Sequence, residues 1–207
     1  DQCRRVVVAE AALFQGHDVD ILCSLSDRIN DRTGIRAFEC GEWGSFGQAI
    51  AGHDIAMWDL FARRAVKPLA RLLNPQARKI VPAYASGIRP DAAAEEIDKG
   101  RARGFDQFKV KVGFARENEV ELLARLSDGL GPSERLCVDA NQAWDEAAAL
   151  DFLRETEAFN LAWVEEPVIA TASESVWRRL ADATPTPLAG GENISGFEDF
   201  QRTIAAG

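Results

Sequence analysis

Four charged side chains recur at nearly constant intervals along this chain, each at the end of an apolar, strand-like run. The four are Lys111 in FKVKVG, Asp139 in LCVDANQ, Glu165 in LAWVEEP and Glu192 in PLAGGEN. The successive intervals are 28, 26 and 27 residues, which is the length that a strand, a helix and two loops require. Each charged group therefore falls at the same phase of a repeating βα unit. In a parallel barrel that phase is the C-terminal rim, where catalytic groups gather.

From residue 79 onward, strand-like and helix-like segments alternate. The strand candidates are KIVPAYAS, FDQFKVKVG, RLCVDANQ, LAWVEEP and PLAGGEN. Apolar residues at i, i+3 and i+4 spacing predict helices near 91–103, 116–129, 144–157 and 173–183, with a fifth starting near residue 196. This alternation predicts a parallel sheet. Units of one length with polar groups at every strand end favour an α/β fold of the (β/α)8 barrel type, incomplete here at about five units.

Residues 1–78 have a different pattern and are predicted to be mostly helical. The segments DVDILCSLSDRIN and AIAGHDIAMWDLFARRAV carry apolar residues at helical spacing. Residues 36–48, RAFECGEWGSFGQ, contain three glycines and are predicted to be a loop. We therefore divide the chain into a helical segment, 1–78, and a partial barrel segment, 79–207. The three missing units of a barrel would take roughly 80 residues, so we expect a fragment of a longer chain.

The composition limits the partners and the compartment. The formal net charge is −9, which disfavours nucleic acid, since phosphate binding needs clustered Lys and Arg. No apolar run reaches the roughly 18 residues of a membrane span. The 4 cysteines form no CxxC pair, which is typical of reduced thiols in a cytoplasmic protein, and Cys137 is predicted to be a small core residue. We expect a homo-oligomer that contacts neither nucleic acid nor membrane.

The strand-end residues predict a base. Lys109 and Lys111 point to the same side of their strand because side chains alternate with period two. Two ammonium groups so close disfavour each other's charge, so the pKa of one should fall and provide an amine base. The alternative is an exposed Lys-x-Lys on a sheet face.

The same residues predict a metal site. Asp139, Glu165 and Glu192 offer three hard oxygen ligands from three successive strands, which suits Mg²⁺. Any one of these acids alone would be read as a helix cap or a surface ion pair. Three acids in phase with a lysine favour the metal site, and Asn141 shares the strand face of Asp139.

The motifs KVKVG, VDANQAW, WVEEP and GGEN, in this order and spacing, resemble the mandelate racemase / muconate-lactonizing branch of the enolase superfamily. The segment HDIAMWDLFARRAVKPLARLL resembles the join between the α+β capping domain and the barrel of that family. The resemblance covers residues 17–207. It implies that residues 1–78 are the helical part of the capping domain. The glycine-rich stretch 41–47 would then be a substrate-covering loop, with Trp43 or Phe46 shaping the pocket.

The resemblance also implies roles for the strand-end residues. Asp139, Glu165 and Glu192 would bind Mg²⁺, and Glu166, the second acid of the EEP motif, would take a supporting role. Lys111 would remove the proton α to the carboxylate of a small-molecule substrate, giving an enediolate, with Lys109 tuning its pKa. Asn141 would hydrogen-bond near the metal or the substrate. A Lys or His base beside Mg²⁺ is a known enolase-superfamily pattern. Glu within GGEN favours a racemase or acid-sugar dehydratase.

Two alternatives stay open at this point. The family needs a second acid or base on a later strand, so the chain is alternatively a catalytically inactive fragment. Its 2 histidines, His17 and His53, both lie in the helical segment. A barrel lyase using Lys111 as a Schiff-base nucleophile is the other alternative. Schiff-base chemistry needs no metal ligands, so the three in-phase acids argue against it.

Overall fold

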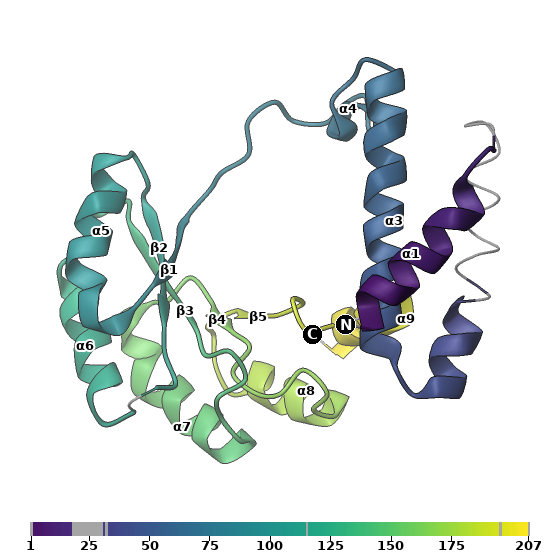
Figure 1. Ribbon diagram of the computed structural model, residues 1–207. Helices are drawn as coiled ribbons and strands as arrows, with labels where there is room; N and C mark the ends of the chain where they lie inside the picture. Colours follow the sequence, from purple (N-terminus) through teal and green to yellow (C-terminus); the bar gives the residue numbers. More distant parts are fainter. Residues whose placement is uncertain (1, 18–30, 32, 115, 195, 207) are drawn as a thin grey trace. The chain divides into compact units, whose positions relative to one another are not determined.

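The computed structural model describes residues 2–17, 31, 33–114, 116–194 and 196–206. The chain divides into two compact units, residues 1–80 and 81–207. The first unit is helical, and the second is a parallel sheet with helices (Figure 1).

The first unit contains α1 (Gln2–Phe14), α3 (Trp43–Arg64) and the short α4 (Leu69–Leu73). Val6 of α1 packs with Phe46 and Ala49 of α3 in a small buried cluster that Ala37 completes. This packing explains why residues 33–40 and the start of α3 are helical and only 41–42 interrupt them. The predicted loop over 36–48 is therefore wrong, because burial of apolar side chains outweighs the weak helix propensity of glycine.

Two further expectations concern this unit. Phe46 is buried in the cluster, so it does not lie on a covering loop, whereas Trp43 is exposed. His53 lies within α3, where its ring contacts the ring of Phe14 at 5.3 Å between centroids. The helix predicted for DVDILCSLSDRIN lies outside the described residues.

The second unit is built on a five-stranded sheet in the order β1-β2-β3-β4-β5 with parallel neighbours. The strands are β1 (Ala85–Ile88), β2 (Gln107–Lys111), β3 (Arg135–Asp139), β4 (Val164–Glu165) and β5 (Leu188–Ala189). The connecting helices are α5 (Ala93–Ala102), α6 (Arg116–Asp128), α7 (Glu146–Thr156) and α8 (Glu174–Asp182), and α9 (Phe197–Ala206) follows β5. Short 3₁₀ turns precede α5 (Pro90–Ala92) and follow α7 (Glu157–Phe159). The predicted α/β architecture is confirmed.

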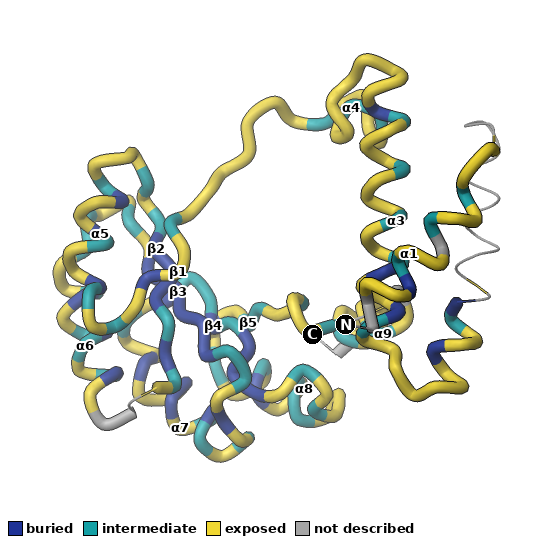
Figure 2. The backbone as a smooth tube through the Cα atoms, viewed as in Figure 1, coloured by how far each residue is buried: buried dark blue, intermediate teal, exposed yellow. Residues whose placement is uncertain are grey.

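Alternation along the strands separates the core from the site. Phe108 and Val110 of β2 are fully buried and pack with apolar residues of the helices, such as Leu123 and Phe152. The helices lie on the outer side of the curved sheet (Figure 1), and the strands β2 and β3 are mostly buried (Figure 2). The intervening residue of β2, Lys109, therefore faces the other side of the sheet.

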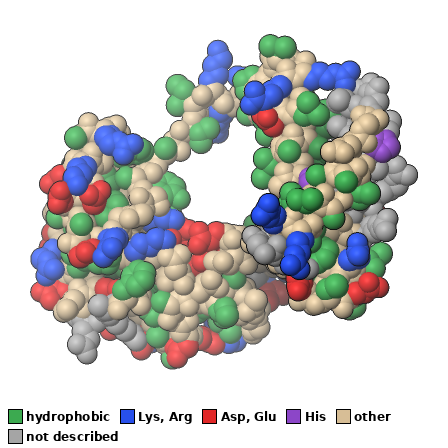
Figure 3. Space-filling model, in the orientation of Figure 1, with side chains coloured by type: hydrophobic (Ala, Val, Ile, Leu, Met, Phe, Trp, Pro, Cys, Tyr) green, Lys and Arg blue, Asp and Glu red, His purple; other side chains and the backbone are tan. Residues whose placement is uncertain are grey.

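The surface carries both signs of charge. On the face shown in Figure 3, Lys and Arg side chains are interspersed with Asp and Glu side chains over the second unit. Among the residues described, none of the helices combines the length and the apolar character needed to cross a bilayer.

Candidate functional site

Strand register brings the predicted site residues to one edge of the sheet. Lys111 pairs with Asp139, and Asp139 pairs with Glu165, each as the last residue of its strand. Glu165 in turn pairs with Ala189 at the end of β5. Glu192 lies beyond β5 and is exposed. The C-terminal ends of neighbouring parallel strands thus place these groups together, as the sequence intervals predict.

Lys109 is buried and lies between two of the acids. Its Nζ donates to both oxygens of Glu165, at 2.9 and 2.8 Å, and lies 3.3 Å from Asp139 Oδ2. Burial acts to lower the pKa of Lys109, but the hydrogen bond to Glu165 and the charges of Glu165 and Asp139 outweigh it and raise the pKa to about 12. The lowered lysine pKa that the sequence predicts is therefore not that of Lys109, because carboxylates rather than a second ammonium surround it.

Lys111 makes a second set of contacts at the strand ends. Its Nζ donates to Asp139 Oδ2 at 2.8 Å and to Asn141 Oδ1 at 2.6 Å. Asn141 also donates through Nδ2 to Glu192 Oε1 at 3.2 Å, which connects Glu192 to the group. Burial acts to raise the pKa of Asp139, but hydrogen bonds from Lys111 and from the Asn141 backbone N–H, with the charges of both lysines, outweigh it and lower the pKa.

The donor set fits a hard divalent cation. Asp139 and Glu165 share the ammonium of Lys109, so these two carboxylates already draw one cationic group to the space between them. Among the hydrogen bonds of the described residues, Glu192 is linked to this group through Asn141. Within the described part of the chain, no three acidic, His or Cys side chains are arranged around one metal position. Carboxylate oxygens are nevertheless the ligands that Mg²⁺ prefers, so the chemistry fits and Glu192 would have to approach the other two acids.

Two aromatic residues lie beside Lys109 and Glu165. Trp163 donates its indole N–H to Glu165 Oε2 at 3.1 Å, and its ring meets Tyr84 edge to face at 5.1 Å. Lys109 Nζ lies 5.6 Å from the centre of the Tyr84 ring, within cation–π range. Trp163 was not among the predicted site residues. It directly precedes β4 and lies two residues before Glu165, and this period-two spacing is the signal that identifies it.

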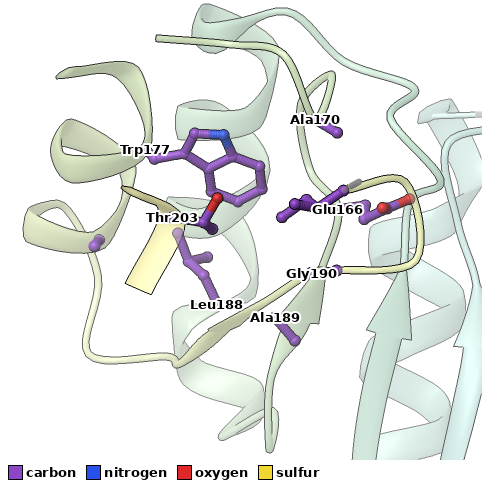
Figure 4. Close-up of a pocket in the computed structure, with 10 residues that line it drawn as sticks. Glu166, Ala170, Trp177, Leu188, Ala189, Gly190 and Thr203 are labelled. Carbon is purple, nitrogen blue, oxygen red and sulfur yellow. The ribbon is translucent and has the colours of Figure 1, made fainter. Parts of the chain in front are cut away.

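A further set of contacts surrounds Glu166, the acid that directly follows Glu165. Glu166 is 1% exposed, and its two carboxylate oxygens accept from Asn193 Nδ2 at 3.0 and 2.8 Å. Glu166 also lines a pocket with Ala189 and Gly190, and Trp177 of α8 stands on the opposite side (Figure 4). Asn193 was not predicted either, although it follows Glu166 at the same interval of 27 residues that separates Glu165 from Glu192.

The loop after Lys111 and the cysteine of β3 have structural roles. Glu119 of α6 accepts from the backbone N–H groups of Gly113 and Phe114 at 2.8 Å each, which fixes the turn out of β2. Cys137 is fully buried, as predicted for a core residue, and burial raises the pKa of its thiol to about 12.

Comparisons with known proteins point to one family. The family model described as Enolase C-terminal domain-like matches residues 92–207. The L-talarate/galactarate dehydratase of Salmonella typhimurium is 36% identical over 169 residues, which are 79% of this chain and 42% of that enzyme.

Solved structures of similar proteins indicate the same family. The crystal structure of a mandelate racemase/muconate lactonizing enzyme from Bordetella bronchiseptica has a TM-score of 0.90 and 36% identity, covering 99% of this chain and 56% of that one. The L-talarate dehydratase from a Polaromonas species, complexed with Mg and L-glucarate, has a TM-score of 0.84 and 29% identity over 99% of this chain and 57% of its own. The chain spans about half the length of the curated relatives it matches, 46% and 42% of the first two.

Proposed function

Because this chain belongs to the Enolase C-terminal domain-like family of the enolase superfamily, we propose that the protein carrying it removes the proton α to the carboxylate of a sugar acid with Mg²⁺ as cofactor. The observation that carries the proposal is the hydrogen-bonded group at the strand ends. In it a lysine, Lys111, contacts an acid, Asp139, that belongs to a row of in-phase carboxylates.

In this proposal Asp139, Glu165 and Glu192 hold the metal ion. When bound, Mg²⁺ supplies positive charge that stabilises the negative charge developing on the substrate carboxylate as the α-proton leaves. The carboxylates that Lys109 and Lys111 now contact would turn to that ion, as the oxygen chemistry of the site favours.

Lys111 takes the α-proton on its Nζ. Asn141 accepts a hydrogen bond from that Nζ at 2.6 Å, so it orients the amine, and we assign it a hydrogen bond to the substrate as well. Lys109 lies one pleat deeper and is 6% exposed, so we assign it a supporting role, keeping positive charge beside Glu165 and Asp139. This division follows from depth, because the residue nearer the rim meets the substrate.

The overall reaction would be racemisation or dehydration of a sugar acid. Relatives of this chain are named as L-talarate/galactarate dehydratase and D-galactonate dehydratase, which supports small polyhydroxy carboxylates as the substrate class. We also propose that residues 1–78 belong to a capping domain and 79–207 to a (β/α)8 barrel. The free thiols of Cys40 and Cys137 support a cytoplasmic protein, which we expect to be a homo-oligomer.

The test is exchange of the substrate α-proton with solvent. The protein is incubated in D₂O with galactarate, L-glucarate or galactonate, and the α-proton signal is followed by NMR. With Mg²⁺ present, the proposal expects the α-proton signal to disappear. After addition of EDTA, it expects the signal to persist. Exchange that continues in EDTA would overturn the metal-dependent mechanism, and no exchange with any of the three acids would overturn the substrate class.

A further inference from the structure

Glu166 and Asn193 each directly follow a proposed metal ligand, Glu165 and Glu192. Their side chains bond to one another rather than to the Lys109 group, with Asn193 Nδ2 donating to both oxygens of Glu166 at 3.0 and 2.8 Å. Glu166 is 1% exposed and has a φ of 43°. This left-handed conformation is uncommon for a residue other than glycine, so the surrounding contacts must hold it in place.

The backbone of Glu166 joins the neighbouring strand ends as well. Its N–H donates to Ala189 O at 2.8 Å, and its carbonyl accepts from the N–H of Gln142, also at 2.8 Å. Glu166 is therefore bonded to the segment that follows Asp139 and to the two segments that flank Glu192.

We infer that Glu166 and Asn193 are positioning residues, whose side-chain bond fixes Glu192 relative to Glu165 and so sets the affinity for the metal ion. The inference rests on the proposed function, because it assumes that Glu165 and Glu192 act as ligands. It concerns how one ligand at the end of β4 and another in the segment after β5 keep a constant separation.

The segment that carries Glu192 explains the need for such a bond. Gly190, Glu192 and Asn193 are all exposed, and Gly191 has a φ of 140° that favours glycine. An exposed, glycine-rich segment loses conformational freedom when it is ordered, which disfavours the ordered state. The hydrogen bond between Asn193 and the buried Glu166 offsets this cost. Without that bond, the Glu166 carboxylate would lose a donor.

Partners that orient ligands affect metal affinity measurably. Loss of a supporting hydrogen bond typically lowers metal affinity by about 10- to 100-fold. We therefore expect Asn193→Ala to weaken Mg²⁺ binding by that factor, as measured by calorimetry on the protein that carries this chain. Asn193→Asp should weaken it too, although it adds a negative charge, because it sets two carboxylates against each other.

An exchange of the two groups provides the rescue. In the double variant Glu166→Gln/Asn193→Asp the amide lies on residue 166 and the carboxylate on residue 193. The hydrogen bond can re-form with donor and acceptor reversed, and the net charge equals that of the wild type. We expect the Mg²⁺ affinity of the double variant to lie within about threefold of wild type. A purely electrostatic effect would not weaken Mg²⁺ binding in Asn193→Asp, which adds a negative charge.

The matched control is Thr156→Val. Thr156 is buried and donates its hydroxyl to Phe152 O at 2.8 Å within α7. This variant loses a buried hydrogen bond but is expected to leave Mg²⁺ affinity unchanged. A loss of affinity equal to that of Asn193→Ala would show that general destabilisation explains the result, and would overturn the inference.

A second measurement separates this inference from the proposed function. Amide hydrogen exchange of residues 190–194, measured without metal, should accelerate in Asn193→Ala and return to the wild-type rate in the double variant. Unchanged exchange would overturn the positioning role. Unchanged Mg²⁺ affinity in Asn193→Ala would overturn it while the proposed function stands. Wild-type protein that binds no Mg²⁺ would overturn the proposed function, and the exchange rates would still decide whether the bond orders the segment.

Discussion

Lys111 Nζ donates to Asp139 Oδ2 at 2.8 Å, and the same two residues are Cα partners in the ladder between β2 and β3. The proposed base and one proposed ligand are therefore positioned by strand pairing, and no loop conformation intervenes between them. Sites built on strands hold their groups more precisely than sites built on loops. The geometry of this pair should consequently persist when the surrounding loops differ.

Replacing Lys111 with Ala should remove the base. Exchange of the substrate α-proton with solvent is expected to fall by about 10²- to 10⁴-fold, the usual contribution of a positioned base. NMR in D₂O measures this directly. Lys99→Ala is the matched control, because Lys99 forms ion pairs with Glu95 and Glu96 on the surface of α5. Equal losses in both variants would exclude Lys111 as the base.

Replacing Glu192 with Gln should weaken Mg²⁺ binding while the fold is kept. Loss of a charged ligand is expected to lower the Mg²⁺ affinity by more than the roughly 10- to 100-fold that follows loss of a supporting hydrogen bond. Because Glu192 is exposed, little packing is lost. Calorimetry measures the affinity. Glu174→Gln, which removes an acid paired with Arg178 on α8, should bind as wild type does. Unchanged affinity in Glu192→Gln would remove this residue from the ligand set.

Gly113→Ala should destabilise the turn that follows Lys111. Gly113 has a φ of 94°, and an added Cβ would lie 2.4 Å from Ala143 Cβ and 3.2 Å from Ala140 O. Backbone strain and the clash together should lower the free energy of unfolding by about 2–4 kcal/mol, measured by urea denaturation. Gly104→Ala isolates the strain, because φ there is 86° with nothing within 4 Å of the added Cβ. A cost equal to that of Gly104→Ala would mean that the clash is relieved by movement of the turn.

Acid should destabilise the second unit partly through Glu134. Hydrogen bonds from Arg101 and from the Gly131 N–H lower the pKa of Glu134 from 4.5 to about 2. A carboxyl with a lowered folded-state pKa stabilises the fold above its unfolded-state pKa and loses this contribution as the pH falls. The loss should therefore occur between pH 4.5 and about 2.

The variant Glu134→Gln tests this. At pH 7 it should lower the free energy of unfolding by about 1 kcal/mol, a value reduced by the partial exposure of the ion pair. The difference from wild type should vanish near pH 2. Glu95→Gln, at an exposed pair with Lys99 on α5, should show a much smaller difference at every pH. A difference in the free energy of unfolding that persists at pH 2 would mean that packing, and not charge, explains the effect.

The second unit could be predicted from the sequence almost to its strand ends. Lys111, Asp139 and Glu165 are the last residues of β2, β3 and β4, because apolar alternation and constant unit length leave few other registers. The first strand begins later than predicted, at Ala85. The preceding residues, KIVPAY, have no hydrogen-bonded strand partner among the described residues. Apolar composition alone does not reveal whether a segment pairs with a neighbouring strand.

The contacts between side chains were less predictable. The sequence places Glu166 next to a proposed ligand, but its bond to Asn193 depends on how residues 190–193 turn after β5. The helical start of α3 was missed for a related reason. Phe46 is buried against Val6, more than thirty positions away, and a local count of glycines contains no information about such a distant partner.

Insertions and deletions should affect the strands and the helices of this unit very differently. Lys109 and Lys111 share one strand face, while Phe108 and Val110 share the other. Adding one residue at the start of β2 would turn the side chains of Phe108 and Val110 toward the acids and those of Lys109 and Lys111 toward the core. Extra residues in a surface loop between strand and helix leave this phase intact. Homologues should therefore vary in length between the strands, while the short strands themselves tolerate no net change in residue number.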